Sequence, residues 1–181
     1  MAIPWITWED AQQMPEDGRR YEAIGGVLYV TAAPRLHHQS IVGRLYLSLH
    51  ELLVAPGHGR LWLAPVGVEF PATGEGVQPD LVFVSTARDG IVAPEGLRGA
   101  PELVVEVASP STAHRDRGVK LRLYEQQGVG EYWIVDPETR AVDVWRFEGE
   151  PRHERFTARL PVLRGAEAIG EIDLVGVFAP D

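Results

Sequence analysis

The sequence predicts an α/β fold in which a central mixed β-sheet is flanked by α-helices. Two apolar runs rich in β-branched and aromatic residues, at 80–84 and 103–107, are bounded by turn residues and indicate buried strands. Between such runs lie segments with helical periodicity, the longest at 37–53, where apolar residues recur every three or four positions. Strands and helices that mix in this way are typical of a sheet covered by helices.

Local signals set the boundaries of the elements. Thr7 is expected to cap a short helix, with Asp10 bonding back to the cap, and Gly25-Gly26 is expected to close a hairpin. The segment Ser109-Pro110-Ser111-Thr112 is expected to cap a helix that Gly128 ends, and 87–101 is expected to be a loop. The predicted helices are 7–14, 37–53 and 113–127, and the predicted strands are 21–24, 27–30, 61–63, 66–70, 80–84, 103–107, 131–135, 141–147, 156–160 and 172–175.

Length and composition bound the class of protein. The 181 residues are enough for one well-filled core and too few for two, so we expect a single domain over 1–181. No apolar run approaches the roughly 20 residues that span a bilayer, and Met1 to Trp5 lack a basic segment followed by a long apolar one. We therefore expect no membrane anchor and no secretory signal.

The chain contains no cysteine, which excludes disulfides, zinc-thiolate sites and a cysteine nucleophile. This composition fits a reducing compartment, and we expect a cytoplasmic protein. The net charge of −9 argues against a protein that coats nucleic acid nonspecifically, because phosphate contacts come from basic surface. It leaves a nuclease open, because acidic residues around a metal ion add to the negative count.

Two acidic residues stand inside or beside the predicted buried strands. Asp80 follows Pro79 at a strand start, and Glu106 lies between valines in the middle of a strand. A carboxylate in such a strand is costly to bury without a partner, and two of them on neighbouring strands would repel each other. A divalent cation held between them would compensate, which predicts metal-assisted hydrolysis of a phosphodiester.

Each of these residues also has a plainer interpretation. Asp80 alone could face solvent at a strand end, and Glu102 is expected to be a solvated residue at a strand entrance. Lys120 or Arg115 could supply Glu106 with a purely structural ion pair. Lys120 borders the apolar face of the helix and can extend its amine toward the end of the Glu106 strand, although most helical lysines face solvent.

Other residues carry weaker signals. Glu22 lies in a predicted strand just before the Gly25-Gly26 turn, and His38 begins a helix where it could contact a phosphate or face solvent. The histidines show no spacing typical of metal ligands. The sequence has no phosphate-binding glycine loop, no dinucleotide fingerprint and no serine nucleophile elbow.

A set of motifs runs along nearly the whole chain in a fixed order. They are Tyr21-Glu22 with Gly25-Gly26, His38 before Ile41, Gln-Pro-Asp-Leu-Val-Phe-Val at 78–84, Ala-Pro-Glu-Leu-Val-Val-Glu-Val at 100–107 followed by Ser-Pro-Ser-Thr, Lys120 with Tyr124, and Gly-Val-Gly-Glu-Tyr-Trp-Ile-Val-Asp-Pro at 128–137. The set resembles the PD-(D/E)XK nuclease superfamily and, within it, the Uma family of bacterial proteins assigned as restriction endonucleases.

The resemblance implies a restriction-endonuclease-like core and an Mg²⁺-dependent endonuclease, with Mn²⁺ as the other candidate cofactor. It implies Glu22, Asp80 and Glu106 as metal-site acids and Lys120 as the catalytic lysine. The superfamily often has that lysine two residues after the last Glu, where this chain has Ala108, so Lys120 resembles the migrated lysine of some branches. The Val107 carbonyl is a further candidate ligand.

His38 and Tyr124 are candidates for substrate positioning. Nucleic acid, most often DNA, is the implied substrate, and a homodimer would suit cleavage of both strands of a duplex. Two alternatives remain open. The chain could be a binding or regulatory module without useful turnover, or a structural protein in which Glu106 and Lys120 form only a buried ion pair.

Overall fold

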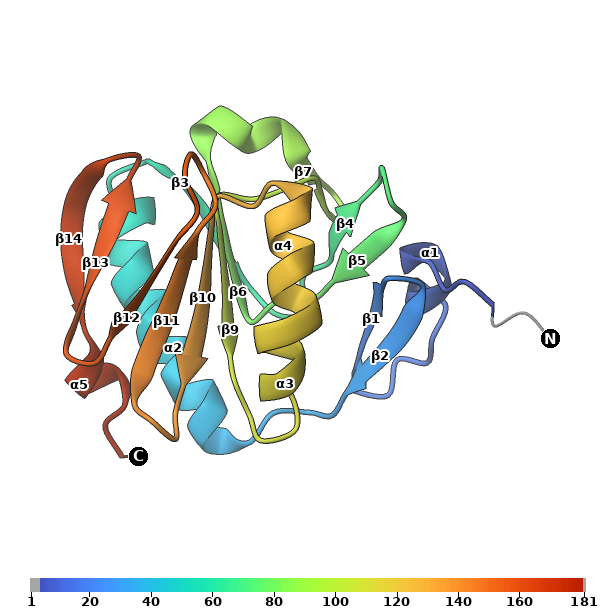
Figure 1. Ribbon diagram of the computed structural model, residues 1–181, viewed down its shortest axis with the longest axis horizontal. Coiled ribbons are helices and arrows are strands. Elements are labelled where there is room, and N and C mark those ends of the chain that lie inside the picture. The colour runs from blue at the N-terminus through green and yellow to red at the C-terminus, as the bar shows by residue number, and fades with distance from the viewer. Residues whose placement is uncertain (1–3, 181) are drawn as a thin grey trace.

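The computed structural model describes residues 4–180, so part of the N-terminal segment that bears on a secretory signal lies outside the described residues. Within this range the strands form two six-stranded sheets and a two-stranded hairpin (Figure 1). We name the two large sheets the central sheet and the side sheet. The central sheet contains, in spatial order, β12 (Arg152–Phe156), β11 (Ala141–Arg146), β10 (Glu131–Asp136), β9 (Leu103–Val107), β6 (Leu81–Ser85) and β3 (Gly59–Leu63).

The side sheet and the helices complete the fold. The side sheet contains, in spatial order, β2 (Val27–Thr31), β1 (Arg20–Ile24), β5 (Glu75–Val77), β4 (Val68–Phe70), β8 (Gly96–Arg98) and β7 (Val92–Ala93). The hairpin pairs β13 (Arg159–Arg164) with β14 (Glu167–Asp173). The helices are α1 (Trp8–Gln12), α2 (Leu36–Leu49), α3 (Ala113–Arg115), α4 (Leu121–Gln127) and α5 (Leu174–Val177), with π-helical turns at His50–Val54 and Asp116–Lys120 and a 3₁₀ helix at Thr86–Ile91.

The central sheet is mixed, as the sequence predicts. Strands β9 and β10 are parallel, whereas β6 pairs with β9 in the antiparallel sense. Every residue of β9 is buried, which explains its continuous apolar run. One face of the sheet packs on α2 through a cluster that includes Ile41, Leu45 and Val105.

The opposite face of the central sheet packs on α4. Val82 and Val104 from the central sheet share a second cluster with Leu123 from α4 and with Phe70 from the side sheet. Helix α4 therefore lies between the two sheets, and both sheets bury apolar side chains against it (Figure 1). Strand β1 of the side sheet can thereby contribute residues to the same region as β6 and β9.

Several predicted elements need correction. The predicted strand at 156–160 is wrong, because it spans the end of β12 and the start of β13, and 172–175 spans the end of β14 and the start of α5. The segment 87–101 is not a plain loop, since it contains β7 and β8. Thr112 does not cap α3 through its side chain; its hydroxyl instead accepts from the Ser109 N–H.

The N-terminal signals are confirmed. Thr7 and Asp10 form the reciprocal capping box at the start of α1, and the hairpin of β1 and β2 closes at Gly25-Gly26 with both glycines at positive φ. Helix α4 ends at Gly128, which adopts the left-handed conformation as predicted. None of the helices within residues 4–180 is long and apolar enough to cross a membrane.

The packing of α1 on the side sheet can be tested at Gly76 in β5. A Cβ atom there would lie 2.2 Å from Cδ2 of Trp8, so Gly76→Ala should lower stability by about 1–3 kcal/mol through overpacking. Gly43→Ala on α2 is the control, because its Cβ meets nothing within 4 Å and alanine favours the helix. Urea denaturation measures the stability of both variants. Equal denaturation midpoints for Gly76→Ala and Gly43→Ala would contradict the packing of Trp8 on β5.

Candidate active site

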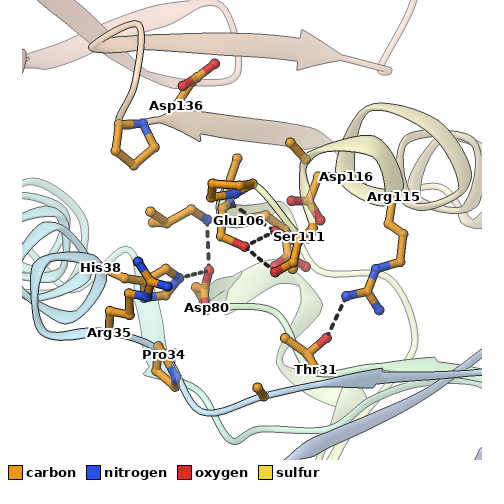
Figure 2. Close-up of a pocket in the computed structure, with 18 of the residues that line it drawn as sticks. Thr31, Pro34, Arg35, His38, Asp80, Glu106, Ser111, Arg115, Asp116 and Asp136 are labelled. Carbon is orange, nitrogen blue, oxygen red and sulfur yellow. Dashed lines mark hydrogen bonds and ion pairs between the residues drawn. The ribbon is translucent and has the colours of Figure 1, made fainter.

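The candidate site lies at the edge of the central sheet where β9 and β10 end and β6 begins. A cavity of about 540 Å³ opens there (Figure 2). Its walls are the segment 31–35 between β2 and α2, the segment 108–112 between β9 and α3, and the turn 136–138 between β10 and β11. The polar residues at its floor are Arg20, Glu22, His38, Asp80, Glu106, Asp116 and Lys120.

The sheet register brings Asp80 and Glu106 to the same face. Leu81 pairs with Val105, so Asp80 and Glu106 extend the same ladder by one residue. Asp80 has the strand parity of Val82, which packs toward α4, and side chains alternate between faces along a strand. The side chains of Asp80 and Glu106 therefore project from the same face of the central sheet, the face that packs on α4.

Asp80 is held by three donors. Its Oδ1 accepts from Nη1 of Arg20 at 2.7 Å, and its Oδ2 lies 3.1 Å from Nε2 of His38 and accepts from the Val107 N–H at 2.8 Å. Burial alone would raise the pKa of Asp80, but His38, Arg20 and Val107 together lower it to about 2. Asp80 is therefore ionised at neutral pH.

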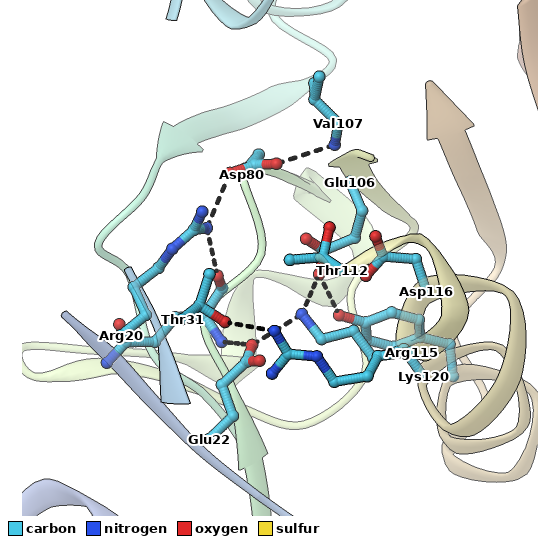
Figure 3. A network of polar contacts seen from close by, with 12 residues as sticks. Arg20, Glu22, Thr31, Asp80, Glu106, Val107, Thr112, Arg115, Asp116 and Lys120 are labelled. Atoms are coloured by element: carbon cyan, nitrogen blue, oxygen red, sulfur yellow. Dashed lines mark hydrogen bonds and ion pairs between the residues drawn. The ribbon is translucent and has the colours of Figure 1, made fainter. Parts of the chain in front are cut away.

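Lys120 joins the other two predicted acids. Its Nζ lies 2.8 Å from Oε1 of Glu106 and 2.8 Å from Oε1 of Glu22 (Figure 3). Tyr124 also donates to Oε1 of Glu106, at 2.9 Å, and Gln78 donates its backbone N–H to Oε1 of Glu22. The structure thus brings together all four residues predicted as catalytic, and it places His38 and Tyr124 beside them.

Arg20 and Asp116 are site residues that the sequence predictions did not include. Arg20 lies on β1 two positions before Glu22, on the same side of the strand, and this spacing was an available signal. Asp116 is buried and lies four residues before Lys120, on the π-helical turn that joins α3 to α4. Such turns are rare in helices and are frequent at functional sites.

The cluster contains more acids than permanent cations. Glu22, Asp80, Glu106 and Asp116 face the positive charges of Arg20 and Lys120. Burial raises the pKa of Glu106 to about 8; Lys120 opposes this shift, and the negative charges of Asp80, Asp116 and Glu22 add to it.

Burial and neighbouring charges also shift the pKa values of Asp116 and Lys120. The pKa of Asp116 is raised by burial against the effect of Lys120. Burial acts to lower the pKa of Lys120, but Glu106 and Glu22 outweigh it and raise that pKa. The raised pKa of Lys120 keeps its amine charged, and the raised pKa of Glu106 favours the protonated form of this acid in the metal-free cluster.

The donor set fits a hard divalent cation. Carboxylate oxygens are the ligands that Mg²⁺ and Mn²⁺ prefer, and Glu22, Asp80 and Glu106 all line the cavity. Oε2 of Glu106 and Oε2 of Glu22 accept no hydrogen bond from any residue between 4 and 180. Over the same residues, no group of three or more acids and histidines is already gathered around one ion position. The charge excess and these open oxygens are the features that suit a cation.

Comparisons with known proteins add a family and a fold. A family model described as "Uma2: Putative restriction endonuclease" matches residues 8–174. Among solved structures, the chain is similar to a "putative nuclease belonging to DUF820" from Anabaena variabilis, with a TM-score of 0.77 and 19% sequence identity. The alignment covers 96% of this chain and 97% of that chain, so the two share the fold. No curated protein matches the chain.

Glu106→Gln tests the charge balance of the metal-free cluster. The raised pKa of Glu106 means that its contribution to stability is present below about pH 4.5 and is lost as the pH rises through about 8. The variant has no carboxyl to ionise at position 106, so at pH 8 it should be at least as stable as the parent. Any excess in the stability of the variant over that of the parent should be smaller at pH 5. Thermal unfolding with chelator present measures this.

The exposed Glu125→Gln variant on α4 is the control for that experiment, and it should follow the parent at both pH values. A loss of about 3–5 kcal/mol in Glu106→Gln at pH 8 would contradict the charge balance described here. Such a loss is expected if Glu106 and Lys120 form a purely structural ion pair.

Proposed function

The chain belongs to the Uma2 restriction endonuclease family, and from this premise we propose that it is a metal-dependent endonuclease that hydrolyses phosphodiester bonds of DNA. The observation that carries the proposal is the placement of Glu22, Asp80, Glu106 and Lys120 at the floor of one open cavity. A purely structural ion pair has no need of a cavity or of surplus acids around it. Buried acids with strongly shifted pKa values in a cavity are typical of catalytic sites.

Mg²⁺ or Mn²⁺ would be held by Asp80, Glu106 and Glu22, with the Val107 carbonyl as a further oxygen ligand. When bound, the ion would activate water and stabilise negative charge on the phosphate. The protein keeps the acids in place for this role. Arg20, His38 and the Val107 N–H orient Asp80 and keep it ionised, and Tyr124 orients Glu106.

Lys120 supplies a positive charge beside the reacting phosphate. Its Nζ contacts both Glu22 and Glu106, so the amine stays at the floor of the cavity. A compact ammonium suits the stabilisation of charge that develops on phosphate oxygens, and it can also orient the attacking water. The role of Tyr124 is positioning, because its side chain is fully buried against Glu106 and its raised pKa keeps the hydroxyl protonated.

A module without turnover is the second candidate function. One observation favours it: Lys120 already pairs with two acids and Arg20 with the third, so internal cations offset part of the negative charge. A screen of single-stranded DNA, duplex DNA and RNA with Mg²⁺, Mn²⁺ or EDTA separates the two. If the protein is an endonuclease, it should cleave a circular or internally labelled DNA only when metal is present. If it binds one of these nucleic acids and cleaves none of them, it is a binding module without turnover.

Lys120→Ala tests the catalytic lysine. Losing one group that stabilises the transition state commonly lowers the rate by about 10²–10³, and Mn²⁺ affinity should stay the same or rise because the amine no longer competes for Glu22 and Glu106. Single-turnover cleavage and Mn²⁺ titration measure the two effects. Lys120→Gln, which keeps a donor without the charge, should be impaired to a similar degree.

Arg122→Ala is the control, because Arg122 is exposed on α4 and does not line the cavity. Its cleavage rate should equal that of the parent. If Lys120→Ala folds and cleaves as fast as Arg122→Ala, Lys120 has no catalytic role and the metal site rests on the carboxylates alone.

A further inference from the structure

We propose that the cavity accepts one nucleic-acid strand and excludes an intact duplex, so that the enzyme cuts single-stranded DNA or unpaired segments within duplex DNA. The inference rests on the proposed nuclease function and names the substrate of the same site. It follows from three features of the cavity, which are the depth of its reactive groups, its fixed walls and the distribution of charge around its mouth.

The reactive groups are deeply recessed. The exposed fraction is 2% for Glu22, 3% for Asp80, 4% for Glu106 and 5% for Lys120. The scissile phosphate must reach these side chains, so it must enter the cavity. A volume of about 540 Å³ lies within the range of roughly 300–1,000 Å³ typical of small-ligand pockets, and a duplex cannot enter it with its partner strand attached.

The walls of the cavity are held by their own hydrogen bonds. Arg115 donates to the hydroxyl of Thr31 at 3.1 Å, which joins the α3 wall to the end of β2 (Figure 2). The side chain of Asp136 accepts from the backbone N–H groups of Glu138 and Thr139, which fixes the third wall. These contacts oppose the opening that a paired strand would require.

The charged residues around the opening of the cavity suit the phosphate backbone of a single nucleic-acid strand. Arg35 and Arg115 lie on different sides of the acids in Figure 2, and both line the cavity. Arg35 is exposed, and its side chain makes no ion pair or hydrogen bond with residues 4–180, so its guanidinium is available for a phosphate. On the third wall Asp136 is paired with Arg117, and the exposed Glu138 beside it would repel the phosphates of a second strand.

The lining also indicates how the strand is held. Among the described residues that line the cavity, none is Phe, Tyr or Trp. Proteins that grip single strands through their bases use such side chains as stacking platforms. The strand is therefore held here through its phosphates, and cleavage should show little dependence on base sequence.

The test uses the parent protein, Mg²⁺ and one labelled DNA sequence in three forms: a single strand, a blunt duplex, and the same duplex with an internal unpaired loop. Unpairing costs a few kcal/mol, so the single strand should be cut at least about tenfold faster than the duplex. The looped duplex should be cut within its loop. Equal rates on single strand and blunt duplex would overturn the inference and leave the nuclease proposal standing, whereas no cleavage of any form with Mg²⁺ or Mn²⁺ would overturn the nuclease proposal itself.

Arg35→Ala tests whether Arg35 binds a phosphate of the single strand. It should raise KM for the single strand several-fold with little change in kcat, and the slope of log affinity against log salt should fall by about 0.7 for one lost phosphate contact. The Arg35 side chain has no hydrogen-bond or ion-pair partner within residues 4–180, so the change should leave the fold intact. Arg122→Ala is the matched control, and an unchanged KM in both variants would contradict the proposed path of the strand.

Discussion

The buried contact of Lys120 with Glu22 and Glu106 is the interaction on which the site depends. It joins three parts of the fold, since Glu22 comes from the side sheet, Glu106 from the central sheet, and Lys120 from the helix between them. Without the amine, two carboxylates would lie buried without a compensating charge, at a cost of several kcal/mol. The same contact brings the acids to one end of the central sheet, where the chain leaves β9 and forms the walls of the cavity.

The positive charges only partly compensate the buried acids, and the negative charge that remains indicates a function. Arg20 and Lys120 cannot neutralise Glu22, Asp80, Glu106 and Asp116 together, so burial and mutual repulsion raise the pKa values of Glu106 and Asp116. A protein selected only for stability would gain from apolar residues of similar volume at these positions. In the proposed function, a divalent cation would remove the excess charge and supply the chemistry that the family suggests.

Three residues of the candidate site could be predicted from the sequence because each of them breaks a local rule. Asp80 and Glu106 are acids at the start and in the middle of apolar strands, and Lys120 borders an apolar helix face. Arg20 and Asp116 break no such rule, because arginine at a strand start and aspartate in a first helical turn are ordinary. The spacing of Arg20 and Glu22 points to Arg20 only once Glu22 is placed in the site. Their roles depend on contacts between distant segments, such as that between Arg20 and Asp80.

The same distinction applies to the fold. The long runs of the central sheet and the periodic helix α2 were recognisable from local pattern, whereas β5, β7 and β8 have only two or three residues each. Strands that short contain no readable alternation. They form because β1 and β4 offer partners to β5, β4 offers one to β8, and β8 in turn offers one to β7. The side sheet, and therefore the placement of Glu22 opposite Lys120, could not be derived from periodicity alone.

The central claim is that the acid cluster is a divalent cation site, and calorimetric titration of the metal-free protein with Mn²⁺ tests it most directly. The parent and the exposed Glu125→Gln variant should bind Mn²⁺ saturably and alike, and Glu106→Gln should bind it much more weakly while remaining folded. Absence of saturable binding by the folded parent, or equal binding by Glu106→Gln, would contradict the claim.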